Sequence, residues 1–235
     1  MAIQHYSGVL NKTIVNQYLQ SYNSTNPSMR TGFAQWIDHL IIAKRTWQSS
    51  CQADDYLYLK ILCVKCRHQK HMQWIHVVST ISALDAASLF DFTKTYKNFD
   101  NLYCHVSKAI GNITFARGIL TRYDISLNIG ILLNKPVYPD YVYLANHTRK
   151  SAQALNVYKY PRVTLKTFPK AFQKLSCMQL EDVLCVYYKV ILGINNNVTS
   201  ITNKSCVFKL NSKNNLLCLF RNAMTLMNQA MNKIP

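Results

Sequence analysis

Two cysteines and three histidines fall within the stretch 63–76, "CVKCRHQKHMQWIH". Four of them follow a regular spacing, which runs Cys63, two residues, Cys66, four residues, His71, four residues and His76. The close cysteine pair favours a tight turn in which both sulfurs reach one ion, and thiolate and imidazole are usual ligands of structural zinc. The spacing therefore predicts a small zinc site at these four residues, with every ligand taken from one short loop.

The same four residues resemble a zinc knuckle, whose pattern is Cys-x2-Cys-x4-His-x4-Cys, with the last cysteine replaced by His76. Arg67 and Lys70 stand where knuckles usually have glycine. The resemblance implies that basic and aromatic side chains of the loop contact single-stranded bases, and it assigns Arg67, Lys70 and Trp74 to nucleic-acid binding. For Trp74, burial in the core is the alternative.

Two other interpretations of the cysteine pair stay open. The preceding segment "LYLKIL" could continue as a helix through Cys63 and Cys66, which would make both of them ordinary core residues. A CxxC pair beside cations also suits thiol-redox chemistry, because nearby positive charge lowers the pKa of a thiol. If zinc is bound, substitute ligands are present at Cys51, His68 and Cys104.

A basic stretch lies further along the chain, where residues 141–174 contain no Asp or Glu. Its Lys and Arg residues are Arg149, Lys150, Lys159, Arg162, Lys166, Lys170 and Lys174, and its rings are Tyr141, Tyr143, Tyr158, Tyr160, Phe168 and Phe172. Cations contact phosphates while exposed rings stack on unpaired bases, so this pattern favours single-stranded nucleic acid over a duplex groove. Tyr158 and Tyr160 are the predicted stacking residues. The alternative is a solvated basic face whose rings point inward.

The whole chain of 235 residues is strongly basic, with 27 Lys and Arg against 10 Asp and Glu and a formal net charge of +17. A compact chain with this excess repels itself unless a polyanion neutralises it, and nucleic acid is the commonest such partner. An acidic membrane surface, an acidic protein or a codon bias without any ligand would also fit. Asn, Lys, Ile and Tyr are abundant and have AT-rich codons, which suggests an AT-biased genome such as that of a virus or parasite.

Motifs for catalysis are absent from the sequence. It contains no P-loop, no G-x-G-x-x-G and no G-x-S-x-G. Its acidic pairs, Asp54–Asp55 and Glu181–Asp182, are adjacent residues, which suits helix termini better than two-carboxylate catalysis. We therefore expect that the protein is not an enzyme, and thiol oxidoreduction is the first activity to test if it is.

The cellular compartment is inferred from three features. The segment "MAIQHYSGVLNKTIVNQ" lacks the basic region and apolar run of a signal peptide. No uninterrupted apolar stretch is long enough for a membrane-spanning helix. The eight cysteines are then expected as thiols or metal ligands in a reducing compartment. We expect an intracellular protein, cytoplasmic or nuclear and not secreted.

The elements that must position these residues are mainly helices. Apolar residues recur at helical spacing within 28–41, 56–63, 81–90, 176–192 and 215–231, whereas "VYPDYVYL" and "YPRVTLKTF" alternate as strands or extended loops do. The sequence predicts a mainly α fold with room for a small β element near 137–168. Three regions are expected: a loosely attached polar arm at 1–27, a helical region at 28–135 with the zinc-knuckle-like loop, and a basic helical region at 136–235. One continuous domain over the last two regions fits equally well.

Together these features predict a basic, non-enzymatic protein that binds single-stranded nucleic acid, RNA favoured over DNA, and carries a small structural zinc site. A viral protein of this kind would protect a genome, suppress host defence or assist transcription. The alternative is an interaction subunit of a viral transcription or replication assembly, recruited by protein contacts. A CxxC thiol-redox protein is the second alternative.

Overall fold

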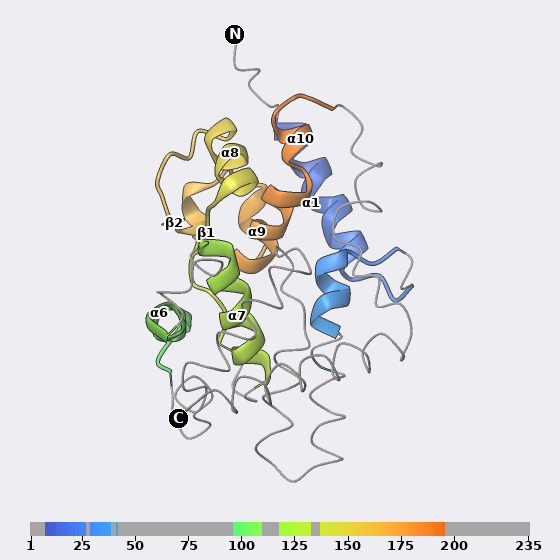
Figure 1. The fold of residues 1–235 in the computed structure, drawn as a ribbon. Helices are drawn as coiled ribbons and strands as arrows, with labels where there is room; N and C mark the ends of the chain where they lie inside the picture. The colour runs from blue at the N-terminus through green and yellow to red at the C-terminus, as the bar shows by residue number, and fades with distance from the viewer. Residues whose placement is uncertain are drawn as a thin grey trace, which may run out of the picture. The chain divides into compact units, whose positions relative to one another are not determined.

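The computed structural model describes residues 8–26, 29–38, 41, 96–109, 118–132 and 137–195 (Figure 1). Outside these ranges lie the predicted zinc ligands and their neighbours, Cys63, Cys66, His71, His76, Arg67, Lys70 and Trp74. The predicted helices at 56–63, 81–90 and 215–231 also lie outside them. Within the described ranges, no helix has both the length and the apolar character that a membrane span requires.

Helices dominate the described chain. They are α1 (Gly8–Tyr22), a helix at 32–38, α6 (Phe99–Ala109), α7 (Ile119–Leu132), α8 (Asn146–Ala154), α9 (Cys177–Val186), α10 (Tyr188–Ile191) and the short 3-10 helices η2 (Leu165–Thr167) and η3 (Phe172–Lys174). β1 (Val142–Tyr143) pairs antiparallel with β2 (Arg162–Val163). The prediction of a mainly α fold with a small β element near 137–168 is confirmed.

The chain divides into two compact units. Residues 1–37 and 139–208 form the first unit, and residues 38–138 and 209–235 form the second. The chain leaves the second unit after Tyr138 and enters the first at Pro139, close to the predicted boundary at 135–136. The first unit thus combines the N-terminal segment with the basic stretch, a combination that the three predicted regions do not contain.

In the second unit, α6 packs against α7 through apolar side chains. Phe99 and Leu102 are buried on one side of α6. The Phe99 ring meets Tyr123 of α7 edge-on, with 5.5 Å between the ring centroids. α6 begins at Phe99 because Asn98 Oδ1 accepts a hydrogen bond from the Asn101 backbone N–H at 3.0 Å, which satisfies a donor of the first turn.

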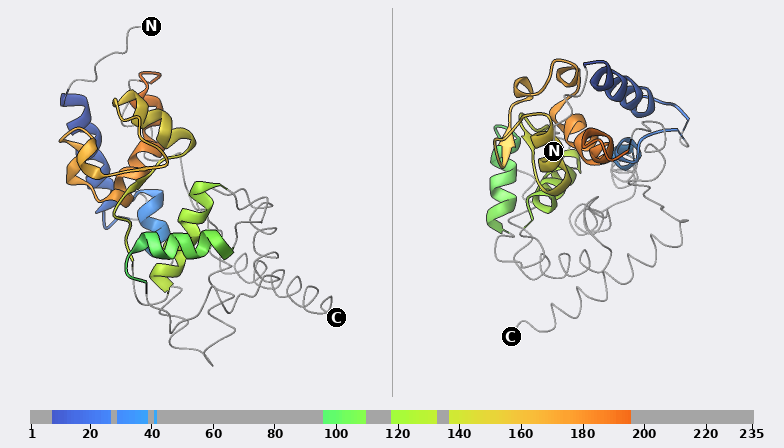
Figure 2. Two further views of the ribbon diagram at one scale, coloured as in Figure 1. Left: turned by 90° about the vertical axis from the view of Figure 1, so that its left-hand side faces the viewer. Right: turned by 90° about the horizontal axis from the view of Figure 1, so that it is seen from above.

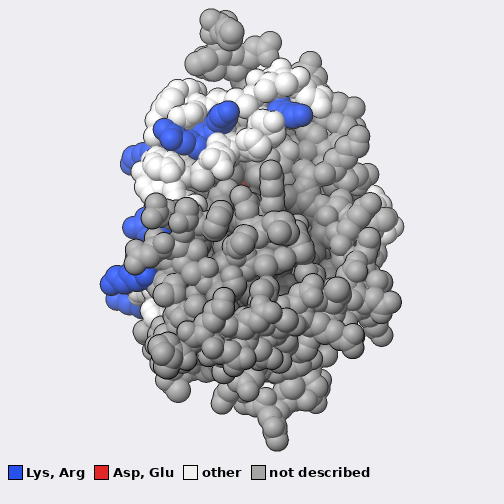
Figure 3. Space-filling view, in the orientation of Figure 1, with Lys and Arg blue, Asp and Glu red and all other residues white. Residues whose placement is uncertain are grey.

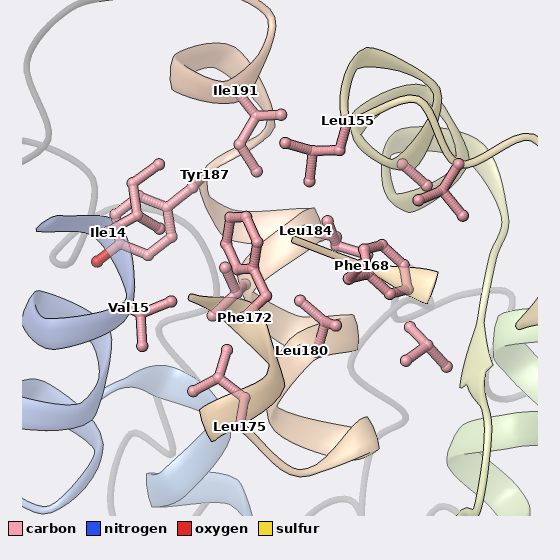
Figure 4. Close-up of a cluster of buried hydrophobic side chains, with 14 of the residues drawn as sticks. Ile14, Val15, Leu155, Phe168, Phe172, Leu175, Leu180, Leu184, Tyr187 and Ile191 are labelled. Atoms are coloured by element: carbon pink, nitrogen blue, oxygen red, sulfur yellow. The ribbon is translucent and has the colours of Figure 1, made fainter. Parts of the chain in front are cut away.

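The core of the first unit surrounds α9 (Figure 4). Leu180 and Leu184 are fully buried on α9. Phe172 of η3 is also fully buried, and Figure 4 shows it between Val15 of α1 and these two leucines. The apolar residues that the sequence spaces along 176–192 therefore form the centre of this unit.

α9 and α10 together cover most of the predicted helix at 176–192, with an interruption at Tyr187. α9 begins at a capping box, in which the Gln179 N–H donates to Ser176 Oγ at 3.1 Å and the Ser176 N–H donates to Gln179 Oε1 at 2.9 Å. After α10, Gly193 adopts a φ of 71°, which glycine reaches at little steric cost. Local chemistry thus fixes where this helical segment starts and stops.

α1 is part of the same core, which differs from the loosely attached arm expected at residues 1–27. Ile14, Val15 and Tyr18 are buried on one side of α1, which packs against η3 (Figure 2). The Tyr18 hydroxyl donates a hydrogen bond to Asp182 Oδ2 at 2.9 Å. The buried stripe is narrow and polar residues fill most other positions of α1, so the composition suggested a solvated segment.

Candidate nucleic-acid interface

All of the basic residues predicted to bind nucleic acid within 141–174 are exposed. They are Arg149, Lys150, Lys159, Arg162, Lys166, Lys170 and Lys174. Over residues 139–195, Asp140 is the one exposed acid, because Glu181 and Asp182 are buried at 0% and 1% exposure. Figure 3 shows Lys and Arg side chains (blue) over α8 and the chain near it, with scarcely any acid (red) on the described part of this face. The segment therefore presents a strongly positive surface.

α8 presents two of these cations because its other side is packed. Thr148 and Ser151 are buried, and Ser151 Oγ donates a hydrogen bond to the Leu184 carbonyl at 2.7 Å, which ties α8 to α9. α8 thus packs against α9. Helical periodicity then places Arg149 and Lys150 on the side of α8 that faces solvent.

A Schellman motif ends α8 and turns the chain back. Asn156 adopts a φ of 62°, a conformation that Asn tolerates better than most residues. The Asn156 N–H donates to the Gln153 carbonyl at 3.0 Å, and the Val157 N–H donates to the Ala152 carbonyl at 2.8 Å. Asn156 Oδ1 also accepts a hydrogen bond from the Tyr158 hydroxyl at 3.2 Å, so the turn holds Tyr158 as well.

Two arginines lie over tyrosine rings. The guanidinium carbon of Arg149 is 4.8 Å from the centroid of the Tyr160 ring, and that of Arg162 is 5.1 Å from the centroid of the Tyr141 ring. Arg162 is paired with Tyr143 in the β1–β2 ladder, and a long side chain can reach the residue diagonally across the strands. A guanidinium held on a ring keeps N–H donors at its edges, a geometry that suits bidentate contacts to phosphate.

The aromatic residues of this stretch differ in exposure, and Tyr141 is half-buried. Tyr158 and Tyr160 are 67% and 50% exposed, as the predicted stacking role requires. Tyr143, Phe168 and Phe172 are buried, so the alternative of inward-pointing rings applies to these three. They anchor β1 and the η2–η3 segment in the core, which is why these short elements keep their place.

The remaining cations lie on two different segments. Lys159 lies between the two exposed tyrosines, whereas Lys166, Lys170 and Lys174 are exposed on the segment that contains η2 and η3. We use the name α8 surface for the surface formed by Tyr141, α8, residues 155–161 and the β1–β2 pair. The η2–η3 lysines form a separate basic segment, and the described contacts do not connect them to the arginines of the α8 surface.

Comparisons with known proteins leave the function to be argued from this geometry. No family model, curated protein or solved structure matches the chain.

A stacked pair of rings beside the basic residues was missed by the sequence analysis. His147 of α8 stacks on Tyr188 of α10, with 4.1 Å between the ring centroids and 4° between the ring planes. His147 is exposed and Tyr188 is half-buried. The two residues are far apart in the sequence and meet because α10 packs against α8, so no local spacing could have signalled them.

Metal and thiol chemistry was predicted at Cys63 and Cys66, which lie outside the described residues. The described ranges contain no group of three or more His, Cys, Asp or Glu that could hold a metal ion. Burial raises the pKa of the Cys177 thiol, and the charge of Asp140 raises it further, so Cys177 stays protonated at neutral pH. Cys104, one of the predicted substitute ligands, is exposed on α6.

Proposed function

We propose that the protein is a non-enzymatic binder of single-stranded nucleic acid, RNA favoured over DNA, and that the α8 surface is its binding site. The observation that carries the proposal is the pair of arginines held over tyrosine rings, Arg149 on Tyr160 and Arg162 on Tyr141. They occur on a segment whose acids, apart from Asp140, are buried.

Phosphate binding is supported by the way in which these arginines are held. A long cationic side chain loses rotamer freedom when it contacts a ligand, at a cost of about 0.5–1.5 kcal/mol. A ring that already restrains the guanidinium reduces this loss. Lys150 and Lys159 are exposed near the two pairs in sequence and add charge that releases counterions from a phosphate backbone.

A preference for unpaired bases is supported by Tyr158. Its hydroxyl is bonded to Asn156 while its ring is 67% exposed, so the ring is restrained but still accessible. The bases of a duplex are stacked on one another, whereas those of a single strand can stack on an accessible ring. An arrangement of restrained cations beside an accessible ring therefore fits a single strand better than a duplex.

The proposal is tested by titrating the full chain into a fluorescently labelled single-stranded RNA at several salt concentrations. We expect one phosphate contact from each of four residues, Arg149, Lys150, Lys159 and Arg162. The logarithm of the association constant should then fall with the logarithm of the salt concentration with a slope of about −3. Stacking on an unpaired base predicts that the single strand binds about tenfold more tightly than a duplex of the same sequence. Single-stranded DNA of that sequence is the control for the RNA preference.

Two results would contradict the proposal. Equal or tighter binding of the duplex would remove the argument from exposed rings. No binding at low salt would favour the other function expected from the sequence, an interaction subunit of a viral transcription or replication assembly, because such a subunit is recruited by protein contacts.

A zinc site at Cys63, Cys66, His71 and His76 is a further part of the proposal, and it is supported by the spacing of these residues alone. We expect one zinc per chain by elemental analysis of protein purified without a metal-affinity tag. Changing Cys63 and Cys66 together to Ser should remove the metal, because zinc loses both thiolate ligands. The matched control is Cys104→Ser, which should keep it. Zinc that survives the double change, or is lost in the control, would contradict this ligand set.

A further inference from the structure

The His147–Tyr188 pair is a flat, partly accessible platform at one edge of the α8 surface, formed by His147 of α8 and Tyr188 of α10. The two rings are within 4° of parallel and their centroids are 4.1 Å apart, so Tyr188 covers one face of the imidazole. His147 is nevertheless exposed. Stacked rings of this kind can bind a further planar group on their outer face, as aromatic side chains do in proteins that bind single strands.

This platform and the Arg149–Tyr160 pair border the exposed side of α8 on opposite flanks. His147 and Arg149 are two positions apart, so their side chains leave the helix about 200° apart around its axis. Thr148 lies between them on the buried side. Lys150 is one turn beyond His147 and lies on the exposed arc that joins the two flanks.

Two exposed lysines lie near the platform in the sequence. Lys150 shares the side of α8 on which His147 lies, and Lys189 directly follows Tyr188; both lysines are exposed. A nucleotide whose base stacks on the imidazole would thus have ammonium groups near its phosphate. A phosphate alone would gain little from the flat faces of two rings, so the chemistry fits a nucleobase better than an isolated anion.

We infer that the outer face of His147 is a further base-stacking position, so that one single strand crosses the exposed side of α8 from Tyr158 and Tyr160, over Lys150, to the His147–Tyr188 stack. The inference rests on the proposed function and adds to it a named position for a base. A purine is the preferred occupant, since it offers the larger ring area to the stack.

The test compares two probes of equal length and charge, oligoadenylate RNA and an oligomer with abasic ribose in place of every nucleotide. His147→Ala should weaken binding of oligoadenylate about tenfold and leave binding of the abasic oligomer unchanged. His147→Phe keeps a ring on Tyr188 and should retain wild-type affinity for both probes. Gln20→Ala, at an exposed position of α1, is the matched control and should change neither affinity.

Each outcome decides between the inference and the proposed function. If His147→Ala binds oligoadenylate as the wild type does, or weakens both probes equally, the stack merely holds α10 against α8 and the inference is wrong while the proposed function stands. If His147→Phe loses affinity as His147→Ala does, stacking is not the interaction and the inference is again wrong. If the wild type binds neither probe at low salt, the proposed function fails and takes the inference with it.

Discussion

Replacing Arg149, Lys150, Lys159 and Arg162 together by Gln should weaken the binding of single-stranded RNA by about two to three orders of magnitude near 0.1 M salt. Each cation that contacts a phosphate changes the salt slope for a single strand by about 0.7, so the slope of the variant should be flatter by about 3. The fold should survive because all four side chains are exposed. Anisotropy titrations at several salt concentrations measure the slope, and urea unfolding checks the fold.

A matched variant separates the α8 surface from the general charge of the protein. Changing Lys166, Lys170 and Lys174 to Gln removes three exposed cations from the η2–η3 segment. This variant should lose far less affinity and keep most of the salt slope. If both variants lose affinity in proportion to the charge removed, the strand binds diffusely and the α8 surface has no special role.

Tyr18→Phe should lower the free energy of unfolding by about 1.5–3 kcal/mol, because it removes a hydrogen bond to a buried charged group. The Tyr18 hydroxyl donates to Asp182 Oδ2 at 2.9 Å, and both residues are buried at 1% exposure or less. The change also loosens the link between α1 and α9, two elements that are distant in the sequence. Urea unfolding measures the effect as a lower midpoint at an unchanged m-value.

Tyr187→Phe is the control for this loss and should not lower the free energy of unfolding. The Tyr187 hydroxyl is buried and makes no hydrogen bond with the described residues, so its removal should leave stability unchanged or raise it by about 1 kcal/mol. If both variants lose equal stability, the hydrogen bond to Asp182 is not the cause.

The pH dependence of the wild type and of Tyr187→Phe gives an independent check on the burial of the Tyr187 hydroxyl. Burial raises the pKa of Tyr187 well above its ordinary value, and the charge of Asp182 raises it further. Above a pH of about 10 the unfolded chain releases this proton while the folded chain keeps it, so unfolding becomes more favourable. The wild type should therefore lose more stability than Tyr187→Phe as the pH rises past this value.

The helical elements could be predicted where apolar residues recur at helical spacing. Leu180, Val183 and Leu184 do so within the predicted helix at 176–192, and the structure starts α9 after Ser176, which forms a capping box with Gln179. α1 was harder to place, since its buried side is narrow. α1 is held by its packing against η3 and by the hydrogen bond from Tyr18 to Asp182. Contacts between segments that are distant in the sequence leave no local sequence pattern.

The candidate site was predictable in its residue types and not in its pairings. Exposed cations could be named because long charged side chains seldom lie fully inside a protein. The Arg149–Tyr160 contact depends on the turn at Asn156, and the ladder register sets which ring Arg162 reaches. The sequence also did not show on which side of the fold the Phe168 ring lies, and the structure buries it.

The burial of Glu181 and Asp182 affects how the stability of the first unit depends on the ions around it. With these carboxylates inside, the described outer shell of residues 139–195 is almost entirely of one sign. Like charges fixed on one surface repel each other and destabilise the fold, and this repulsion grows as the ionic strength falls. On the proposed function, a bound polyanion would reduce this repulsion and stabilise the folded unit by mass action, so the strand would also raise the resistance of the protein to unfolding.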